Sequence, residues 1–250
     1  VGPAEGRLAS GLMGWGRLAE TAEVIGAIAT KLGSQGDLAG RTIVVSAGGT
    51  QEAIDPVRVI TNRSSGKMGY AVAAAARDRG ARVLLITAST SQDDPVGIET
   101  RHVESASEML SAVLMDCQGA DAIVMAAAVA DYTPVNPATN KIKKSATGKI
   151  SIELTKTVDI LSAIPRDLVR VGFAAESTNL IPYAQAKVES KSLDFIVAND
   201  ITTPGSGFGA DKNKVSIVSR EKVEDIPIMS KYAVANEILD RVAKRFVVQR

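Results

Sequence analysis

Two hydroxyl residues, a glycine and a lysine stand consecutively in the order Ser64-Ser65-Gly66-Lys67. A helix is expected to begin near Ser65 and to end before Gly80, because apolar residues recur at helical spacing and a glycine suits the C′ position. Free backbone N–H groups, the positive end of the helix dipole and a lysine together attract anions. This stretch is therefore a candidate phosphate site, although Ser64 could instead simply cap the helix.

Neither of the two common phosphate-binding sequence patterns accounts for this stretch. A P-loop would end in Gly-Lys-Ser/Thr, whereas Gly66-Lys67 is followed by Met68. A dinucleotide fingerprint would place Gly-x-Gly-x-x-Gly directly after the strand, whereas the sequence from Gly48 reads Gly-Gly-Thr-Gln. The prediction therefore rests on the loop itself, whose roughly fifteen residues are too many for an ordinary connection between a strand and a helix.

Apolar runs of the kind that form buried strands recur along the chain. They predict strands at residues 42–46, 82–87, 121–126, 169–174 and 194–198. Helical patterns alternate with them, which is typical of a parallel sheet with helices on both faces. Ligands of such open sheets bind at the carboxyl ends of strands. Asp131 stands at one of these ends, where it could hold a metal or a hydroxyl group, or could cap a helix.

The segment after Asp131 interrupts the alternation. Residues 136–156 hold five lysines against one acid, and they could bind a polyanion or form a solvated face. Residues 141–154 are expected to form a β-hairpin beside the main sheet. A further strand at residues 214–219 is expected at an antiparallel edge, and the turn-rich residues 203–209 are a candidate flexible lid.

Composition excludes several classes of protein. A formal net charge of +1 over 250 residues gives no support for a nucleic-acid binder. No apolar run reaches the ~18 residues of a membrane span, and no signal-peptide pattern is present, so we expect no membrane partner and a cytoplasmic location. The one cysteine, Cys117, cannot form a disulfide within the chain, which suits a reducing compartment. The one histidine, His102, is expected to be exposed on a short strand.

Seven blocks, taken together and in order, resemble one family: the bacterial form of phosphopantothenate–cysteine ligase (phosphopantothenoylcysteine synthetase) of coenzyme A biosynthesis. The shared order of seven blocks is specific, whereas any one of them alone would be weak. The blocks are AGGT (47–50), IDPVR (54–58), NRSSGKMG (62–69), AAAVAD (126–131), KIKK (141–144), GFAAE (172–176) and AND (198–200).

The resemblance implies a fold and a domain division. It implies an open Rossmann-like, mostly parallel sheet with helices on both faces, extended by a β-hairpin, in a homodimer whose sites are built across the two subunits. Bacterial members are fused behind a flavin-dependent decarboxylase, and residues 5–20 resemble the C-terminal end of that enzyme, with Ser10 in place of a cysteine. We therefore expect residues 1–37 to be a remnant of the decarboxylase and a linker, carrying no flavin, and residues 38–250 to be the synthetase domain.

The implied reaction uses CTP, Mg²⁺, 4′-phosphopantothenate and L-cysteine. The pantothenate carboxylate attacks the α-phosphate, pyrophosphate leaves and an acyl-cytidylate forms, from which the cysteine amine displaces CMP. The resemblance makes Asn62 and Lys141 catalytic and places Asp131 at the metal. It implies substrate-binding or phosphate-binding roles for Gly48, Asn62, Ser64, Ser65, Gly66 and Lys67. It implies nucleotide-binding roles for Met125, Ala126, Ala127, Asp131, Lys141, Thr155, Lys156, Thr157, Val158, Phe173, Lys187 and Lys191.

Two other functions stay open at this point. The α/β pattern alone favours an NAD(P)-binding reductase, although the glycine fingerprint is missing and tyrosines are the only evident proton donors. The second alternative is a dimerising scaffold for the decarboxylase, without an activity of its own. Asn62 also has an alternative explanation, because asparagine tolerates a left-handed backbone conformation better than most residues.

Overall fold

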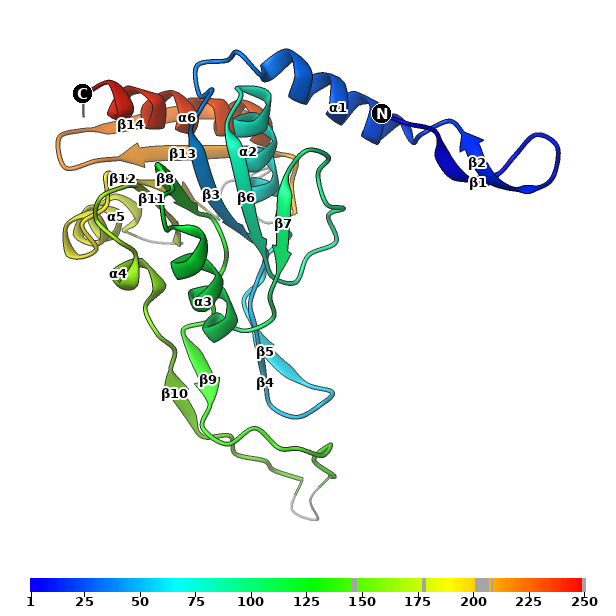
Figure 1. Ribbon diagram of the computed structural model, residues 1–250. Coiled ribbons are helices and arrows are strands. Elements are labelled where there is room, and N and C mark those ends of the chain that lie inside the picture. Colours follow the sequence, from blue (N-terminus) through cyan, green and yellow to red (C-terminus); the bar gives the residue numbers. More distant parts are fainter. Residues whose placement is uncertain (145–147, 177–178, 201–206, 208, 249–250) are drawn as a thin grey trace.

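The computed structural model describes residues 1–144, 148–176, 179–200, 207 and 209–248. Within them, the centre of the fold is an eight-stranded sheet in the order β14-β13-β12-β11-β8-β3-β6-β7 (Figure 1). Its parallel strands are β3 (Thr42–Ala47), β6 (Arg82–Thr87), β7 (Glu99–His102), β8 (Ala122–Met125), β11 (Val169–Glu176) and β12 (Phe195–Asp200). The antiparallel strands are β13 (Lys212–Val218) and β14 (Val223–Ser230). The predicted open, mostly parallel sheet is confirmed.

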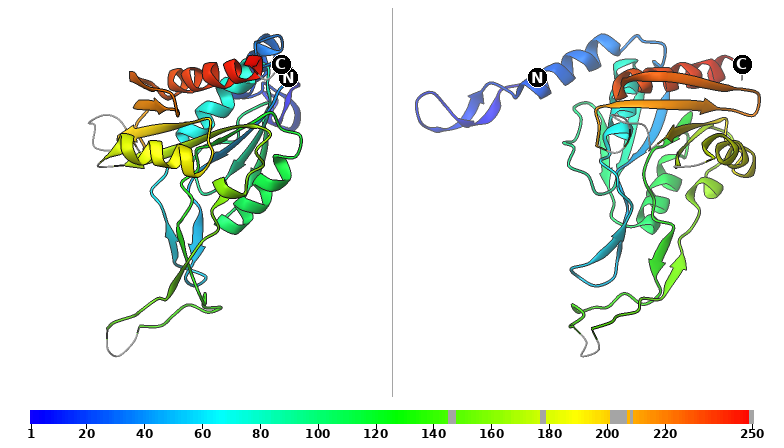
Figure 2. Two further views of the ribbon diagram at one scale, coloured as in Figure 1. Left: turned by 90° about the vertical axis from the view of Figure 1, so that its left-hand side faces the viewer. Right: turned by 180° about the vertical axis from the view of Figure 1, so that it is seen from behind.

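Helices cover both faces of this sheet, which explains why the central strands are continuously apolar (Figure 2). On one face, Val45 packs into a core with α2 (Lys67–Asp78) and α6 (Lys231–Val248). On the other face, the adjacent Val44 packs with α3 (Ala106–Asp116) and α4 (Ile160–Ala163). A third cluster joins α5 (Leu180–Ser190) to β11 and β12. Successive residues of one strand thus enter opposite cores.

The strand order reverses between β3 and β8. From β3 the chain continues to β6 and then β7 on one side, whereas β8, β11 and β12 follow on the other side. In open α/β sheets the loops that leave such a reversal diverge and open a crevice at the carboxyl ends of the strands. The segments that follow β3 and β8 are therefore the ones placed to form a site.

Two small hairpins project from the sheet on the same side (Figure 1). The first, β4 (Gln51–Ala53) with β5 (Val59–Thr61), lies inside the long connection between β3 and α2 and was not predicted, because its strands are only three residues long. The second pairs β9 (Tyr132–Pro134) with β10 (Leu154–Lys156). The hairpin expected over residues 141–154 is therefore corrected. The N–H of Ile142 donates to the Asp55 carboxylate at 3.0 Å instead of joining a strand ladder.

The strand predicted at residues 214–219 is not an edge of the sheet. β13 pairs with β12 on one side and with β14 on the other, so β14 and β7 are the outer strands among the described residues. The sequence gives little sign of β14, because Ile226 is the only one of its residues that is buried. The final helix, α6, begins directly after Ser230, whose hydroxyl accepts a hydrogen bond from the N–H of Ala233 at 3.1 Å.

The N-terminal residues extend away from the sheet (Figures 1 and 2). They form a hairpin, β1 (Ala4–Arg7) with β2 (Met13–Arg17), followed by the helix α1 (Thr21–Gly33). The end of α1 is closely packed: a Cβ added at Gly33 would lie 2.3 Å from the carbonyl oxygen of Asp78 in α2. None of the helices in the described part of the chain combines the length and the apolar character that crossing a membrane requires.

The single cysteine and the single histidine lie in contrasting environments. Cys117 is buried after α3, and burial, together with the negative charge of Asp116, raises the pKa of its thiol to about 12. His102 is exposed at the end of β7, as expected, with its Nε2 2.9 Å from a carboxylate oxygen of Asp94. Neither residue lies in the pocket described next.

Candidate active site

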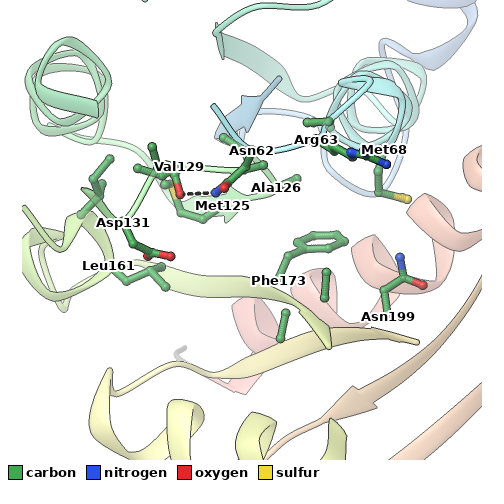
Figure 3. Close-up of a pocket in the computed structure, with 18 of the residues that line it drawn as sticks. Asn62, Arg63, Met68, Met125, Ala126, Val129, Asp131, Leu161, Phe173 and Asn199 are labelled. Carbon is green, nitrogen blue, oxygen red and sulfur yellow. Dashed lines mark hydrogen bonds between the residues drawn. The ribbon is translucent and has the colours of Figure 1, made fainter. Parts of the chain in front are cut away.

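A pocket of about 910 Å³ opens where the strand order reverses, between the N-terminus of α2 and the ends of β8, β11 and β12. Figure 3 shows Met125, Ala126 and Asn62 on one side of it and Phe173 on the other, with Asp131 and Asn199 toward opposite ends. Most residues predicted for the site line this pocket. They are Asn62, Ser64, Ser65, Gly66, Lys67, Met125, Ala126, Ala127, Asp131, Lys156, Thr157, Val158, Phe173, Lys187 and Lys191.

Three predicted site residues do not line the pocket of this chain. Gly48 is buried behind it, where its carbonyl accepts a hydrogen bond from the N–H of Ala128 at 2.8 Å. Thr155 lies on β10, opposite Thr133 of β9. Lys141 is exposed on the long segment that connects β9 to β10. This segment projects away from the sheet (Figure 1). A single chain therefore does not bring Lys141 to the other predicted residues.

The N-terminus of α2 borders the pocket with free backbone donors. Gly66 is the N-cap residue, with φ +73°, and no side chain caps the helix. The first bond of the helix runs from the N–H of Tyr70 to the carbonyl of Gly66 at 3.1 Å. The N–H groups of Lys67 and Met68 precede this bond, so they cannot be satisfied within the helix, and both residues line the pocket. The alternative in which Ser64 caps the helix is wrong, and the stretch has the properties of an anion site.

A network of hydrogen bonds fixes the backbone of the segment after β8. The hydroxyl of Ser46 accepts from the N–H of Ala127 at 3.1 Å, and the hydroxyl of Thr50 accepts from the N–H of Ala130 at 2.9 Å. Thr50 is fully buried, so this second bond is shielded from water. The small side chains of this segment leave its remaining backbone groups accessible to a ligand.

Asn62 connects the loop before α2 to the segment after β8. Its side-chain Nδ2 donates a hydrogen bond to the carbonyl of Val129 at 2.9 Å (Figure 3). Its backbone is not left-handed, because the non-glycine residues with positive φ in the described chain are Asn179 and Ser192. The explanation of Asn62 by backbone conformation is therefore wrong. Its amide instead lies in the pocket wall, where an amide can both donate and accept.

Lysine side chains surround the pocket, and two of them already have carboxylate partners. The Nζ of Lys191 contacts Asp159 and donates to the Ser162 hydroxyl at 3.2 Å. Burial opposes ionisation of Asp159, but its hydrogen bonds with Lys191 and Ser162 outweigh burial and lower its pKa. The Nζ of Lys67 donates to Asp211 at 2.6 Å, and this contact lowers the pKa of Asp211. When a polyanion binds, these two lysines can therefore leave the carboxylates and contact the oxygens of the ligand instead.

The sequence analysis missed several pocket residues, and Lys231 and Asn199 are the two whose environments are most unusual. Lys231 is buried at the start of α6, where its Nζ donates to the carbonyl of Gly207 at 3.1 Å. Burial, and repulsion from Lys67, lower the pKa of Lys231. Asn199 is only 9% exposed, and its Oδ1 is buried without a hydrogen-bond partner among the described residues. The AND block could have indicated Asn199, whereas Lys231 reads only as the first residue of an amphipathic helix.

Asp131 is the predicted metal ligand, and its carboxylate lies in the pocket. β9 begins at the next residue, so the alternative in which Asp131 caps a helix is wrong. The described residues contain no group of three His, Cys, Asp or Glu side chains that could hold a metal ion on their own. Mg²⁺ is commonly bound by one or two carboxylates together with substrate phosphates. Asp131 fits that arrangement, in which the phosphates complete the coordination.

An open, doubly wound α/β sheet with an anion-attracting helix terminus and several lysines at its point of reversal defines a protein of the Rossmann-like α/β class. Residues 38–246 match the family model described as the DNA/pantothenate metabolism flavoprotein C-terminal domain, and the chain belongs to this family. The family resemblance drawn from the seven sequence blocks is confirmed.

Curated relatives carry the name coenzyme A biosynthesis bifunctional protein CoaBC. The Bacillus subtilis protein is 44% identical over 250 residues, covering 97% of this chain and 61% of the relative. The Mycobacterium bovis protein is 42% identical over 260 residues, covering 96% of this chain and 62% of the relative. This chain therefore spans about three fifths of the length of these relatives.

Solved structures share the fold. A crystal structure of the C-terminal domain of a CoaBC protein is 38% identical, with a TM-score of 0.72, and the match covers 84% of this chain and 97% of that one. A Cab2 mutant in complex with phosphopantothenate-cysteine is 14% identical, with a TM-score of 0.68, and covers 92% of this chain and 96% of that one. At 14% identity the second likeness shows the fold alone.

Proposed function

We propose that the protein is a phosphopantothenate–cysteine ligase of coenzyme A biosynthesis that uses CTP and forms an acyl-cytidylate. The observation that carries this proposal is the convergence of a helix N-terminus, several lysines and a rigid strand-end backbone on one pocket. Two polyanionic substrates must share the site of such an enzyme, and several cationic or N–H donors are needed to hold them. Homology to the C-terminal part of CoaBC supports the assignment.

The first half-reaction joins the pantothenate carboxylate to the α-phosphate of CTP. The N–H groups at the start of α2 and the Lys67 ammonium are placed to bind phosphate oxygens, with Lys187 and Lys191 across the pocket. When bound, Mg²⁺ would supply positive charge to the triphosphate, and Asp131 would hold it. Because the N–H groups at the start of α2 are held in position by the helix before the reaction, they stabilise developing charge without reorganisation.

The second half-reaction transfers the acyl group to the cysteine amine. Attack by the amine places negative charge on the acyl oxygen while CMP is still attached. The Asn62 amide lies in the pocket wall two residues before Ser64, and it can donate a hydrogen bond to that oxygen without adding charge beside the phosphates. Its present bond to the Val129 carbonyl keeps the side chain on the segment that follows β8.

The proposal includes a homodimer, and the apolar surface of the projecting hairpins supports it. Exposed apolar side chains gather on these hairpins and on the segments that continue them, and they include Val57, Val59, Tyr132, Val135, Ile150, Ile152 and Leu154. Such a surface is typical of a site that another chain covers. In a dimer joined through it, Lys141 would reach the pocket of the partner subunit. Because β13 pairs with both β12 and β14, residues 214–218 offer no unpaired strand edge to a partner subunit.

The N-terminal arm is proposed to belong to a fused flavin-dependent decarboxylase. The relatives extend well beyond the region that this chain matches. The arm extends away from the sheet and exposes Met13, Trp15 and Leu18, of which Trp15 is 71% exposed. Large apolar side chains in such a position favour a protein partner that packs against them.

The proposal is tested by measuring pyrophosphate release by the purified chain. Release should require CTP and 4′-phosphopantothenate together, and the amide product should appear only when L-cysteine is added. Reactions without each substrate are the controls. A chain that only supports a decarboxylase would release no pyrophosphate, and a reductase would consume NADPH in a parallel assay. Either result would reject the ligase.

A further inference from the structure

We propose that Thr90 is a positioning residue for the anion site at the N-terminus of α2. Thr90 lies in the loop after β6 and does not line the pocket. Its Oγ1 donates to the carbonyl of Ser65 at 2.9 Å and accepts from the N–H of Gln92 at 3.2 Å. The hydroxyl is therefore oriented by its own loop and directed at the residue that precedes the N-cap glycine.

The peptide unit between Ser65 and Gly66 is held at both ends. Its carbonyl accepts the bond from Thr90, and its N–H donates to the Oγ of Ser64 at 3.3 Å. Ser64 lines the pocket and Thr90 does not, so the N–H is directed toward the pocket side and the carbonyl away from it. Two hydroxyls thus select one of the two orientations of this peptide.

Gly66 makes the opposite orientation accessible, which is why the peptide needs a restraint. A glycine populates positive and negative φ about equally, and Gly66 has φ +73°. It also permits close contact, because a Cβ added there would lie 2.6 Å from the Thr90 Oγ1. If the peptide flipped, the Ser65 carbonyl oxygen would face the pocket and repel a phosphate. We infer that the Thr90 hydroxyl prevents this flip.

The loop that carries Thr90 is itself fixed to the sheet. The N–H of Ala88 donates to the carbonyl of Ala47 at 3.0 Å, and the N–H of Gly49 donates to the carbonyl of Ser89 at 3.2 Å. An independent sign that this pocket takes a ligand is Asn199, which is nine-tenths buried and whose Oδ1 lacks a partner among the described residues. The inference rests on the proposed function only for the identity of the anion.

The experiment compares wild type with Thr90→Val, Thr90→Ser and Thr100→Val. Valine keeps the shape of threonine and removes the hydroxyl, whereas serine retains it. Thr100→Val is the matched control, because the buried Thr100 Oγ1 has no partner among the described residues. Calorimetric titration with inorganic pyrophosphate gives Kd without requiring turnover. A partly unfolded sample would change the stoichiometry but not Kd, so Thr90→Val remains informative if it is less stable.

We expect pyrophosphate to bind Thr90→Val at least ~5-fold more weakly, in line with the loss of one hydrogen bond. The KM for CTP should rise by a similar factor while kcat changes less than about twofold, because the hydroxyl acts on binding geometry and not on the reacting atoms. Thr90→Ser and Thr100→Val should stay within about twofold of wild type.

Thr90→Val binding pyrophosphate as tightly as wild type would overturn the inference, as would equal weakening in Thr90→Ser. Wild-type protein that binds pyrophosphate but does not use CTP would instead contradict the proposed function. In that case the comparison of Kd values would still decide the role of Thr90.

Discussion

The carboxylate of Asp55 accepts a hydrogen bond from the N–H of Ile142 at 3.0 Å, although 87 residues separate them in sequence. Asp55 also contacts the guanidinium of Arg58, whose Nη2 donates to the carbonyl of Ile142 at 3.0 Å. The loop that leads to Asn62 is thereby tied to the segment that carries Lys141. Both proposed catalytic residues therefore lie on segments that this connection joins.

Asp55→Asn should loosen this connection and reduce stability in a pH-dependent manner. Hydrogen bonds from Arg58, followed by the Ile142 N–H, hold the pKa of Asp55 well below its usual range. Because the folded pKa is lowered, the stabilising contribution is complete above the unfolded pKa of about 4 and is lost as the pH falls through the folded value. Thermal midpoints of wild type and Asp55→Asn should therefore differ at pH 7. The difference should begin to shrink only when the pH falls below ~4, and it should keep shrinking as the pH falls further. A difference that does not vary with pH would contradict this prediction.

Lys141→Gln should slow acyl-cytidylate formation at least ~10²-fold, the lower end for loss of one preorganised charge-stabilising donor. Lys143→Gln, two residues away on the same exposed segment, is the control and should change the rate less than about threefold. Rapid-quench measurement of pyrophosphate release gives the rate directly. A near wild-type rate for Lys141→Gln would show that Lys141 belongs to a solvated surface.

Asn62→Asp should separate the two half-reactions. It nearly preserves the shape of the side chain but replaces a donor with a negative charge beside polyanions. Pyrophosphate release should continue, while acyl-cytidylate accumulates after cysteine is added, as measured by mass spectrometry of a single-turnover mixture. Equal slowing of both half-reactions, or loss of folding, would assign Asn62 to the architecture of the loop.

CTP should be used in preference to ATP. The segment after β8 presents a backbone fixed by Ser46 and Thr50, which could read the edge of a pyrimidine base with its remaining N–H and C=O groups. The value of kcat/KM for CTP should exceed that for ATP by at least ~10-fold, the discrimination that one well-placed polar contact supplies. Equal or better activity with ATP at low nucleotide concentration would reject this prediction.

Ile152→Asp should dissociate the proposed homodimer. Ile152 is 38% exposed on the segment that leads into β10. A partner subunit would bury a charge placed there, at a large cost in the free energy of association. Ile228→Asp is the control, because Ile228 is 49% exposed on the outer strand β14. Light scattering at micromolar concentration should find wild type and Ile228→Asp as dimers and Ile152→Asp as a monomer. A monomeric wild type, or dissociation by Ile228→Asp alone, would contradict the proposed interface.

Much of the central sheet could be predicted from sequence because its strands are buried on both faces. The continuous apolar run 42–46 predicts β3 almost to the residue, because a run that is apolar on both faces must be buried on both faces of a sheet. Polar residues at strand ends indicated most of the pocket for a related reason. In a parallel sheet the carboxyl ends of the strands meet at one edge, so residues distant in sequence become neighbours there.

The parts that were missed depend on contacts that no local pattern records. β14 is mostly exposed, so its sequence lacks the alternation that identifies a half-buried strand. Residues 141–144 are held by a hydrogen bond from the N–H of Ile142 to the Asp55 carboxylate, and not by pairing with a neighbouring strand. Lys231 owes its place in the pocket to bonds with the carbonyls of Gly207 and Lys212, at 3.1 and 3.4 Å. Most of the predicted lid, residues 203–209, lies outside the described residues.

The burial of Cys117 has a consequence for an enzyme whose proposed substrate is itself a thiol. Disulfide exchange requires a thiolate at the attacking sulfur and access to it, and Cys117, with its pKa raised to about 12, offers neither at neutral pH. Free cysteine and its oxidised form, cystine, can therefore reach high concentrations around the protein without forming a mixed disulfide. The same property makes Cys117 a reporter of local unfolding. An aromatic disulfide reagent should release its coloured thiolate only from molecules in which the core beneath α3 has opened.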